Sequence, residues 1–447
     1  MNHQQSTTNK SWETVIGVEI HIETNTKTKM FCACSADYFG AKPNTHTCPV
    51  CLGLPGALPF INKEAIEKCI KIGLALGCQI SEHSLFERKN YFYPDLPKGY
   101  QISQYRWPLC TNGSIEIDGE YGKKTIRINR AHQEEDTGKL THIGSETFID
   151  FNRSGLPLVE VVTEADFRSS AEVRDYAKKL QQIIKSIGVS EANMEKGDMR
   201  LEANVSVRPQ GQEELAPYRV ELKNINSFKF IGDAIDYEVK RQIKLLEKGD
   251  KIALQTRGYN ENKKETFLQR VKEEANDYRY FPEPDLPALS INPADVARIK
   301  ASLGELPAQK ENKYLAFGLS QNTAQTIANS QARTQLFEKA IKKIDQKDIA
   351  NLANFYVNKG SVATSPDDLI KRYMRGQANK SQIITNEDEL TLILKAVIEE
   401  NQQSVASYKA GKLNAIQALI GAVMKKTQGK ADANRARVLL EKQLGSQ

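Results

Sequence analysis

The chain has 447 residues, 40% of them hydrophobic and 26% charged, a composition typical of a folded globular protein of roughly two to four domains. It has no apolar run of about 18 residues, which excludes a membrane-spanning helix, and residues 1–10 are polar and unlike a signal peptide, so we expect a cytoplasmic protein. The net charge is only +6, but residues 404–447 carry eight Lys or Arg against two acids. This basic end indicates a polyanionic partner such as nucleic acid, although a solvated helical face explains the charges equally well.

Residues 15–23 alternate between apolar and polar side chains, which predicts a half-buried strand. One face carries Val18, Ile20 and Ile22, and the other carries Glu19, His21 and Glu23. Two carboxylates beside an imidazole suit a hard divalent cation. Taken alone, this polar face is more often simply solvated.

Four cysteines follow within residues 32–51, as the pairs Cys32/Cys34 and Cys48/Cys51. Two close thiolate pairs joined by a short loop can enclose a tetrahedral zinc ion, and four thiolates leave no open position, so the site would be structural. His46 lies in the loop as a substitute ligand. The alternative is a set of four free or buried thiols.

Further polar groups follow in three regions. Glu134, Glu135 and Asp136 are adjacent acids that, taken alone, indicate a solvated turn. The alternating stretches 199–208 and 219–223 predict two more half-polar strands. These stretches, the turn before the first and the residues directly after the second carry Glu195, Asp198, Arg200, Glu202, Asn204, Glu221, Lys223, Asn224 and Asn226. Asn152, Arg153 and Glu160 are similar in kind. Such a surface can hold metal ions and phosphate oxygens, or it can be a salt-bridged solvated face.

Ser169 and Ser227 each precede residues at helical spacing, so they are expected to cap helices that end near Gly188 and Gly249. Three prolines in residues 281–287 predict an extended exit from the first domain. Beyond about residue 291 the pattern is nearly all helical. These features predict an α+β fold with helices on one side of a sheet, followed by helical domains.

Common nucleotide-binding and ammonia-releasing motifs are missing from the sequence. There is no GxxxxGK[ST] loop and no GxGxxG turn. There is also no Ser-Ser-Lys amidase signature and no recognisable cysteine glutaminase. Any ATP site must therefore depend on metal–carboxylate chemistry with arginine or lysine, and any ammonia must come from another chain.

Several long stretches resemble the B subunits of bacterial and organellar tRNA-dependent amidotransferases. They are Glu13–His21, Cys48–Gly56, Arg88–Asp95, Tyr100–Gln104, His132–Lys139, Asp150–Gly155, Glu221–Phe228 and Asp277–Asp285, and the similarity resumes around Gln403–Gln428. The resemblance implies a catalytic domain similar to glutamine synthetase, with a mixed or antiparallel sheet. One departure is that the helical region Asn351–Asn386 is shorter than is usual in the family.

The resemblance also implies the reaction. Such a protein binds tRNA mischarged with glutamate or aspartate, phosphorylates the side-chain carboxylate with ATP and Mg²⁺, and amidates it. The ammonia comes from a glutaminase partner, the A-type chain of the complex, and a small third chain of the C type completes a heterotrimer.

By the same resemblance, Glu19, His21 and Glu134 or Glu135 are expected around Mg²⁺. Arg153, Arg200 and Lys223 are expected to stabilise phosphate or transition-state charge. The remaining candidates are Glu195, Glu202, Asn204, Asn224 and Asn226 for the nucleotide and its metal, Lys89 and Lys98 for the ammonia route, and Lys425, Lys426 and Lys430 for tRNA phosphates.

The expected domains are a catalytic domain at 1–293 with the zinc loop at 32–51, a helical linker domain at 294–385 and a helical tRNA-binding tail at 386–447. Two other functions remain open on the sequence. The chain could be a non-catalytic, zinc-stabilised tRNA-binding protein, or a ligase that acts on a free amino acid. A free-amino-acid ligase has no need of a basic tail.

Overall fold

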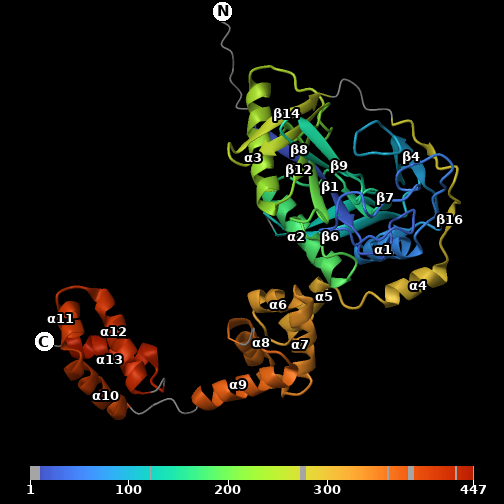
Figure 1. Ribbon diagram of the computed structural model, residues 1–447. Helices are drawn as coiled ribbons and strands as arrows, with labels where there is room; N and C mark the ends of the chain where they lie inside the picture. The colour runs from blue at the N-terminus through green and yellow to red at the C-terminus, as the bar shows by residue number, and fades with distance from the viewer. Residues whose placement is uncertain are drawn as a thin grey trace, which may run out of the picture. The chain divides into compact units, whose positions relative to one another are not determined.

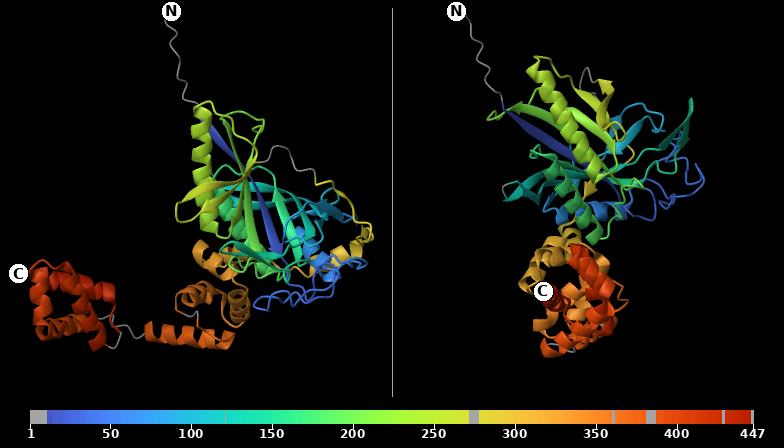
Figure 2. Two further views of the ribbon diagram at one scale, coloured as in Figure 1. Left: turned by 45° about the horizontal axis from the view of Figure 1, so that its top comes forward. Right: turned by 90° about the vertical axis from the view of Figure 1, so that its left-hand side faces the viewer.

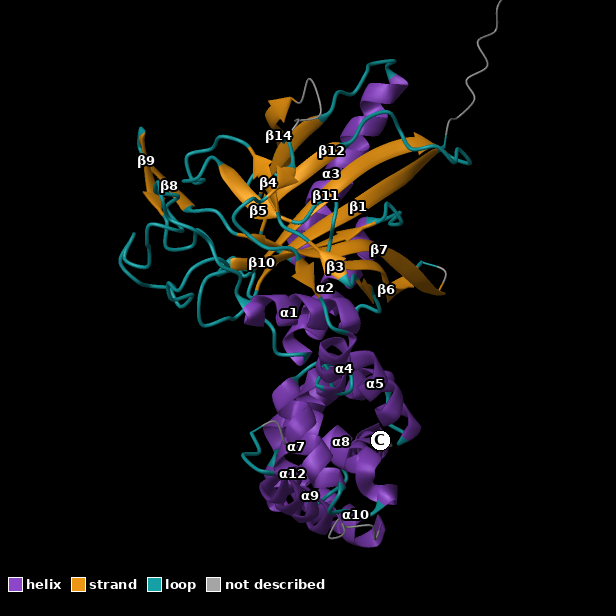
Figure 3. Cartoon of the chain, turned by 90° about the vertical axis from the view of Figure 1, so that its right-hand side faces the viewer, coloured by secondary structure: helices purple, strands orange, loops and turns teal. Residues whose placement is uncertain are grey.

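The computed structural model describes residues 11–120, 122–271, 278–359, 362–380, 387–427 and 430–445 (Figure 1). The chain forms two compact units, Met1–Gln309 and Lys310–Gln447. The first unit contains the strands and the second is helical, as the secondary-structure colours in Figure 3 show. None of the helices in the described ranges is long and apolar enough to cross a membrane.

Unit 1 is built around a nine-stranded sheet with the order β14-β13-β12-β11-β1-β10-β7-β6-β2. Neighbouring strands are antiparallel except β12 and β13, which are parallel, so the sheet is mixed. The strands are β1 (Trp12–Glu23), β2 (Gln79–Ile80), β6 (Cys110–Gly119), β7 (Gly122–Glu135), β10 (Pro157–Thr163), β11 (Met199–Pro209), β12 (Val220–Ile225), β13 (Gln255–Asn260) and β14 (Glu265–Val271).

Helices α1 (Lys63–Ala75), α2 (Ser170–Ser186) and α3 (Phe228–Glu247) pack on one face of this sheet, as Figure 2 also shows. Ile16, Val18, Ile20 and Ile22 of β1 point into this core, because alternate residues of a strand face opposite sides. The polar residues of the same strand therefore share the other face. The predicted caps are confirmed, because Ser169 accepts a hydrogen bond from the Glu172 amide and Ser227 accepts one from the Lys229 amide.

Three small sheets border the large one. The first joins β15 (Phe281–Pro282), β4 (Glu87–Asn90) and β5 (Tyr100–Ser103), the second joins β16 (Leu289–Ser290) to β3 (His83–Ser84), and the third joins β8 (Lys139–Ile143) to β9 (Glu146–Asp150). The proline-rich segment is thus extended, as expected, but it pairs within unit 1. Helix α4 (Pro293–Ala301) packs on α1 and also belongs to this unit.

Unit 2 contains two separate apolar cores, and α5 (Pro307–Ala316) carries the chain into it. The first core involves α6 (Gln321–Ala328), α7 (Gln331–Ile341), α8 (Ile349–Asn358) and α9 (Pro366–Lys380), with a 3₁₀ turn at Gln346–Asp348. The second involves α10 (Glu387–Glu400), α11 (Gln402–Lys409), α12 (Ile416–Lys426) and α13 (Ala433–Gly445), with a 3₁₀ turn at Leu413–Ala415. The expected boundary at 385/386 lies outside the described residues.

Candidate active site

The face of the large sheet opposite the helices carries a band of charged side chains, which we call the acidic face. Its position follows from strand register. Glu19 of β1 lies opposite Glu202 of β11, and His21 lies between Arg200 of β11 and Glu160 of β10. Since all these strands keep their apolar residues in the core, the polar side chains gather on the one remaining face.

The first group on the acidic face consists of His21, Glu134 and Glu160, whose possible ligand atoms all lie within 4.8 Å of one another. Nε2 of His21 is 3.3 Å from Oε1 of Glu134 and 3.9 Å from Oε2 of Glu160. His132 supports the group, with its Nε2 3.1 Å from Oε2 of Glu160. Burial alone lowers the pKa of His21, but the hydrogen bond to Glu134 and the nearby acids raise it to about 9.

The second group consists of Glu19, Glu202 and Glu221, which also lie within 4.8 Å of one another. Asn204 donates a hydrogen bond of 2.9 Å to Glu19. Nζ of Lys223 lies 2.9 Å from Oε2 of Glu202 and 3.2 Å from Oε1 of Glu221. Burial, followed by repulsion from Glu160 and Glu202, raises the pKa of Glu19. Additional positive charge would stabilise these acids.

Both groups fit a hard divalent cation by donor chemistry, because carboxylate oxygens are the ligands that Mg²⁺ prefers and each group offers several within reach of one point. Glu134 gives a second indication. Its side chain is buried, and its Oε2 has no hydrogen-bond partner among the described residues. A buried carboxylate oxygen without a partner is costly, and a bound cation would satisfy it.

Glu134 and Glu135 end β7, Asp136 follows directly, and all three are buried, so the solvated turn that their sequence indicates is wrong. Glu134 faces His21, whereas Glu135 points to the other side of the strand. There Glu135 forms an ion pair with Lys98 and accepts a 2.9 Å hydrogen bond from the amide of Ile102. The structure therefore brings Glu134, and not Glu135, to the first group.

Both of the arginines that were expected to stabilise phosphate charge contact Asp136. Nη2 of Arg200 lies 2.5 Å from Oδ2 of Asp136, and Nε of Arg153 lies 3.7 Å from the same oxygen. Arg153 also donates hydrogen bonds of 3.0 and 2.7 Å to the carbonyls of Thr137 and Gly138. Although burial opposes it, the two arginines hold the pKa of Asp136 well below its usual range. Both arginines therefore brace the end of the acidic face.

Lys89 lies at the edge of the acidic face, with its ammonium group 5.0 Å from the centre of the Tyr278 ring. Lys89 is half-buried, which disfavours its charge, but the nearby acids, with Glu134 first among them, raise its pKa. Lys98 lies farther away, against Glu135 and 5.4 Å from the centre of the Tyr100 ring.

A cavity of about 860 Å³ opens beside the acidic face. Glu19, Glu160, Glu221, Lys89 and Lys223 line it. The remaining sequence candidates lie elsewhere. Glu195 is exposed in the turn before β11, and Asn226 is exposed just after β12. The side chain of Asn224 lies outside the described residues.

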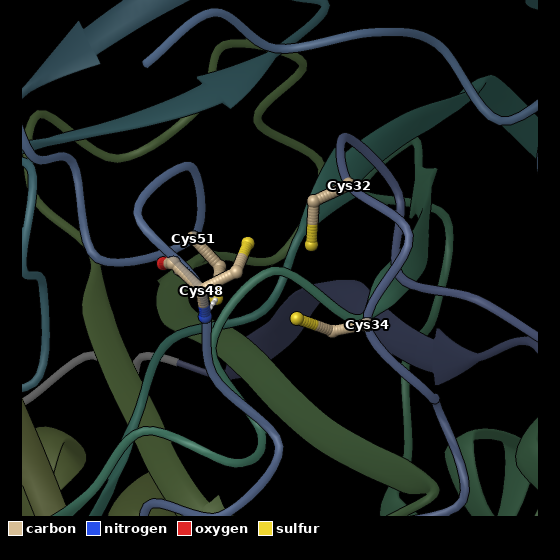
Figure 4. Close-up of side chains that lie close together, drawn as sticks. All are labelled: Cys32, Cys34, Cys48 and Cys51. Carbon is tan, nitrogen blue, oxygen red and sulfur yellow. Dashed lines mark hydrogen bonds between the residues drawn. The ribbon is translucent and has the colours of Figure 1, made fainter. Parts of the chain in front are cut away.

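The four cysteines of residues 32–51 come together, with all four sulfur atoms within 4.8 Å of one another and directed at a common centre (Figure 4). Such a set of thiols can bind a metal ion. Within the set, the hydrogen bond from Cys32 lowers the pKa of Cys51 to about 5, which favours its thiolate. The same contact raises the pKa of Cys32, and burial raises that of Cys34 to about 11. Outside this set, the backbone amide of His46 is bonded to Asn152.

In unit 2, Lys425 and Lys426 are exposed at the end of α12 and Lys430 is exposed just beyond it. Lys426 forms an ion pair with Glu400. Ile416, Leu419 and Val423 of α12 are buried in the second core, and Ile420 is partly buried against it.

Sequence reasoning gave too little weight to two residues of the acidic face. Glu160 stood only as a group similar to others, and His132 only as the start of the family-like stretch His132–Lys139. Yet Nε2 of His132 lies 3.1 Å from Oε2 of Glu160, beside His21. The signal for Glu160 was its position as the one charged residue in the apolar run 156–162. A buried acid in such a run needs a specific partner.

The arrangement has the donor groups that a site for divalent metal ions and phosphate groups needs, on the open face of a mixed sheet. Comparison with known proteins makes this specific. The family profile of the GatB/GatE catalytic domain matches residues 14–297, and that of the GatB domain matches residues 317–444. The chain therefore belongs to the family of aspartyl/glutamyl-tRNA(Asn/Gln) amidotransferase B subunits.

Individual relatives agree over nearly the whole chain. The chain is 41% identical to the aspartyl/glutamyl-tRNA(Asn/Gln) amidotransferase B subunit of Persephonella marina, over 97% of its own length and 99% of the relative's. It is 42% identical to the protein of that name from Dehalococcoides mccartyi and 43% identical to that from Caldanaerobacter subterraneus, with the same coverage.

Proposed function

We propose that this chain is the carboxylate-activating subunit of a tRNA-dependent amidotransferase. It uses ATP to phosphorylate the side chain of glutamate on the glutamine tRNA, of aspartate on the asparagine tRNA, or of both, and it then amidates the activated group. The observation that carries the proposal is the pair of carboxylate groups beside one cavity, in a chain that has no phosphate-binding loop.

Within this proposal, His21, Glu134 and Glu160 would hold one Mg²⁺, and Glu19, Glu202 and Glu221 would hold another. When bound, Mg²⁺ neutralises the polyphosphate and the attacking carboxylate, which otherwise repel each other. Glu135 was the alternative to Glu134, but its ion pair with Lys98 leaves Glu134 as the better ligand.

The cationic side chains have two roles, binding phosphate oxygens and orienting the acidic face. Lys223 lies between Glu202 and Glu221, where its ammonium group can bind a phosphate oxygen. Arg200 and Arg153 orient the end of the acidic face through Asp136. The oxygen of a carboxylate is a poor leaving group until it is phosphorylated, so the chain must position the carboxylate in line with the transferred phosphoryl group.

Ammonia must come from a partner, since the sequence has neither glutaminase signature. We assign this role to a glutaminase chain of the A type, with a small chain of the C type completing a heterotrimer. Lys89, a half-buried lysine whose pKa Glu134 raises, would lie where the ammonia route reaches the acidic face, and Lys98 would lie earlier on that route.

Three further assignments remain proposals. The cysteine set is a structural zinc site, because four thiolates complete a tetrahedron. The catalytic domain is similar to glutamine synthetase, with limits of 1–293, followed by helical domains at 294–385 and 386–447. Lys425, Lys426 and Lys430 contact tRNA phosphates.

The test is an ATP-consumption assay on the chain with its two partner chains. Glutamylated glutamine tRNA is compared with uncharged tRNA, and free glutamate is tested separately. Phosphate release that requires the mischarged tRNA supports the proposal. A chain that binds tRNA without any such turnover is the zinc-stabilised binding protein instead, and full activity on free glutamate indicates a small-molecule ligase.

A further inference from the structure

The turn formed by residues 151–155 lies between the four cysteines and the end of the acidic face. The carbonyl of Gly155 accepts a 2.7 Å hydrogen bond from the amide of Met30, just before the cysteine loop (residues 32–51). The amide of the same glycine donates a 2.8 Å hydrogen bond to the carbonyl of Asp136, directly after the end of β7. One residue of the turn therefore joins the entry of the cysteine loop to the strand end that carries the acids.

The side chain of Asn152 belongs to the cysteine side of this turn. The sequence groups Asn152 with the polar residues of the phosphate-binding surface, but its side chain is fully buried and contacts the cysteine loop instead. Its Oδ1 accepts a 2.8 Å hydrogen bond from the amide of His46, and its Nδ2 donates one of 2.8 Å to the carbonyl of Lys42. A buried amide that satisfies two backbone groups of another segment fixes that segment relative to its own backbone.

The next residue, Arg153, belongs to the acidic side. Its Nε lies 3.7 Å from Oδ2 of Asp136, and the same carboxylate oxygen lies 2.5 Å from Nη2 of Arg200. Arg200 of β11 lies opposite His21 of β1 in the strand register. Adjacent side chains of one short turn thus hold the cysteine loop and the end of the acidic face, and a chain of direct contacts leads from Asn152 to the strand position of His21.

Lys29 makes a second connection between the cysteines and the turn. Its side chain is fully buried, and its Nζ lies 3.8 Å from Sγ of Cys51 and 3.2 Å from the carbonyl oxygen of Phe151, which accepts its hydrogen bond. A metal ion held by four thiolates leaves net negative charge on the set, which would attract this ammonium group more strongly than neutral thiols do. Loading of the cysteine set would therefore tighten the contact that holds the turn.

We propose that Asn152 is a positioning residue, through which zinc in the cysteine set fixes Arg153 and Asp136 at the end of the acidic face, so that zinc and Mg²⁺ bind to the chain cooperatively. The inference rests on the proposed function, because it takes His21, Glu134 and Glu160 as a Mg²⁺ site. Coupling between two binding sites is reciprocal, so Mg²⁺ must strengthen zinc binding by the same factor by which zinc strengthens Mg²⁺ binding.

The test measures the zinc Kd of the full chain by equilibrium competition with a chelator of known zinc affinity, with and without saturating Mg²⁺. Mg²⁺ prefers oxygen ligands, so it does not compete for the four sulfurs. Asn152→Ala breaks the link on the cysteine side, and Arg153→Met breaks it on the acidic side. The matched control is Gln242→Ala, another fully buried amide, which bonds to Tyr218 and Val205 under helix α3.

In the wild type, Mg²⁺ should lower the zinc Kd by about fivefold or more, the lower end of the usual range for coupled sites. Asn152→Ala and Arg153→Met should each bind zinc with a Kd that no longer depends on Mg²⁺, whereas Gln242→Ala should keep the wild-type ratio. A purely structural Asn152 would weaken zinc equally with and without Mg²⁺ and leave the ratio unchanged. That result, or a wild-type Kd that ignores Mg²⁺, overturns the inference. Arg153→Met leaves the contacts of Asn152 intact, so it decides the question if Asn152→Ala does not fold.

His21→Ala separates this inference from the proposed function. It should abolish both the effect of Mg²⁺ on the zinc Kd and the ATP hydrolysis that depends on mischarged tRNA. If His21→Ala keeps both, the first acidic group is not a Mg²⁺ site, and the proposed function fails together with the coupling. If His21→Ala loses the hydrolysis but keeps the Mg²⁺ effect, only the coupling fails.

Discussion

Replacing Glu283 by glutamine removes the negative charge that ties the proline-rich segment to β4. Arg88 donates two hydrogen bonds of 2.7 Å to the two oxygens of Glu283, and the Glu283 side chain is fully buried. The segment that contains Glu283 also carries Tyr278 and Tyr280 to the cavity. The substitution therefore tests whether this ion pair holds one wall of the site in place.

The expected cost follows from burial. Breaking one partner of a buried ion pair costs about 3–5 kcal/mol because an uncompensated charge remains. The Arg88 side chain is 20% exposed, so water can solvate part of it, and glutamine keeps one hydrogen bond. We expect a loss of about 2–3 kcal/mol in the free energy of unfolding. For a unit of this size that lowers the Tm by about 5 °C.

Differential scanning calorimetry of the full chain measures this shift for unit 1. The matched control is Asp285→Asn, since Asp285 contacts the same guanidinium at 3.4 Å but is 39% exposed. An exposed pair of this kind contributes about 1 kcal/mol or less, so the control should change the Tm by about 2 °C at most. Equal shifts for the two variants would refute the reasoning from burial.

Three other predictions concern the metal sites and the tail. Glu19→Gln or His21→Ala should lower the rate of ATP hydrolysis that depends on mischarged tRNA by about 100-fold or more. Binding of tRNA, measured by filter retention, should not change. Wild-type turnover in either variant would show that the replaced residue is not part of the active site. Cys48→Ser should release zinc, measured by metal analysis, and lower the Tm, whereas the buried Cys78→Ser should keep its zinc; a metal-free wild type of full stability would contradict this. Truncation after residue 380 should raise the Kd for tRNA and reduce its dependence on salt, and an unchanged salt slope would exclude the tail as a tRNA-binding element.

The regular elements of unit 1 could be predicted from the sequence because local patterns determine them. Alternation identified β1 and β11, and serine caps identified the starts of α2 and α3. The order of the strands could not be read in this way. The β1 strand pairs with β10 and β11, which are more than 100 residues away, and no local pattern encodes such pairing.

The site was predictable in part for the same reason. Glu19 and His21 were visible as one face of a strand, and the cysteines were visible by spacing. The burial of Glu134 was not visible, because it depends on β7 lying beside β10 in the interior of the sheet. The separation of Glu134 from Glu135 likewise required the strand to continue through both residues, where the sequence indicated a turn.

The register between β1 and β11 also limits how this family can vary in length. Adding one residue within either strand would turn every acid beyond it toward the helices and every core residue toward the cavity. Single-residue insertions and deletions there should therefore be lost by selection, whereas length changes should accumulate in connections such as residues 210–219 between β11 and β12. In a site built on strand alternation, selection should therefore remove insertions and deletions more strongly than substitutions.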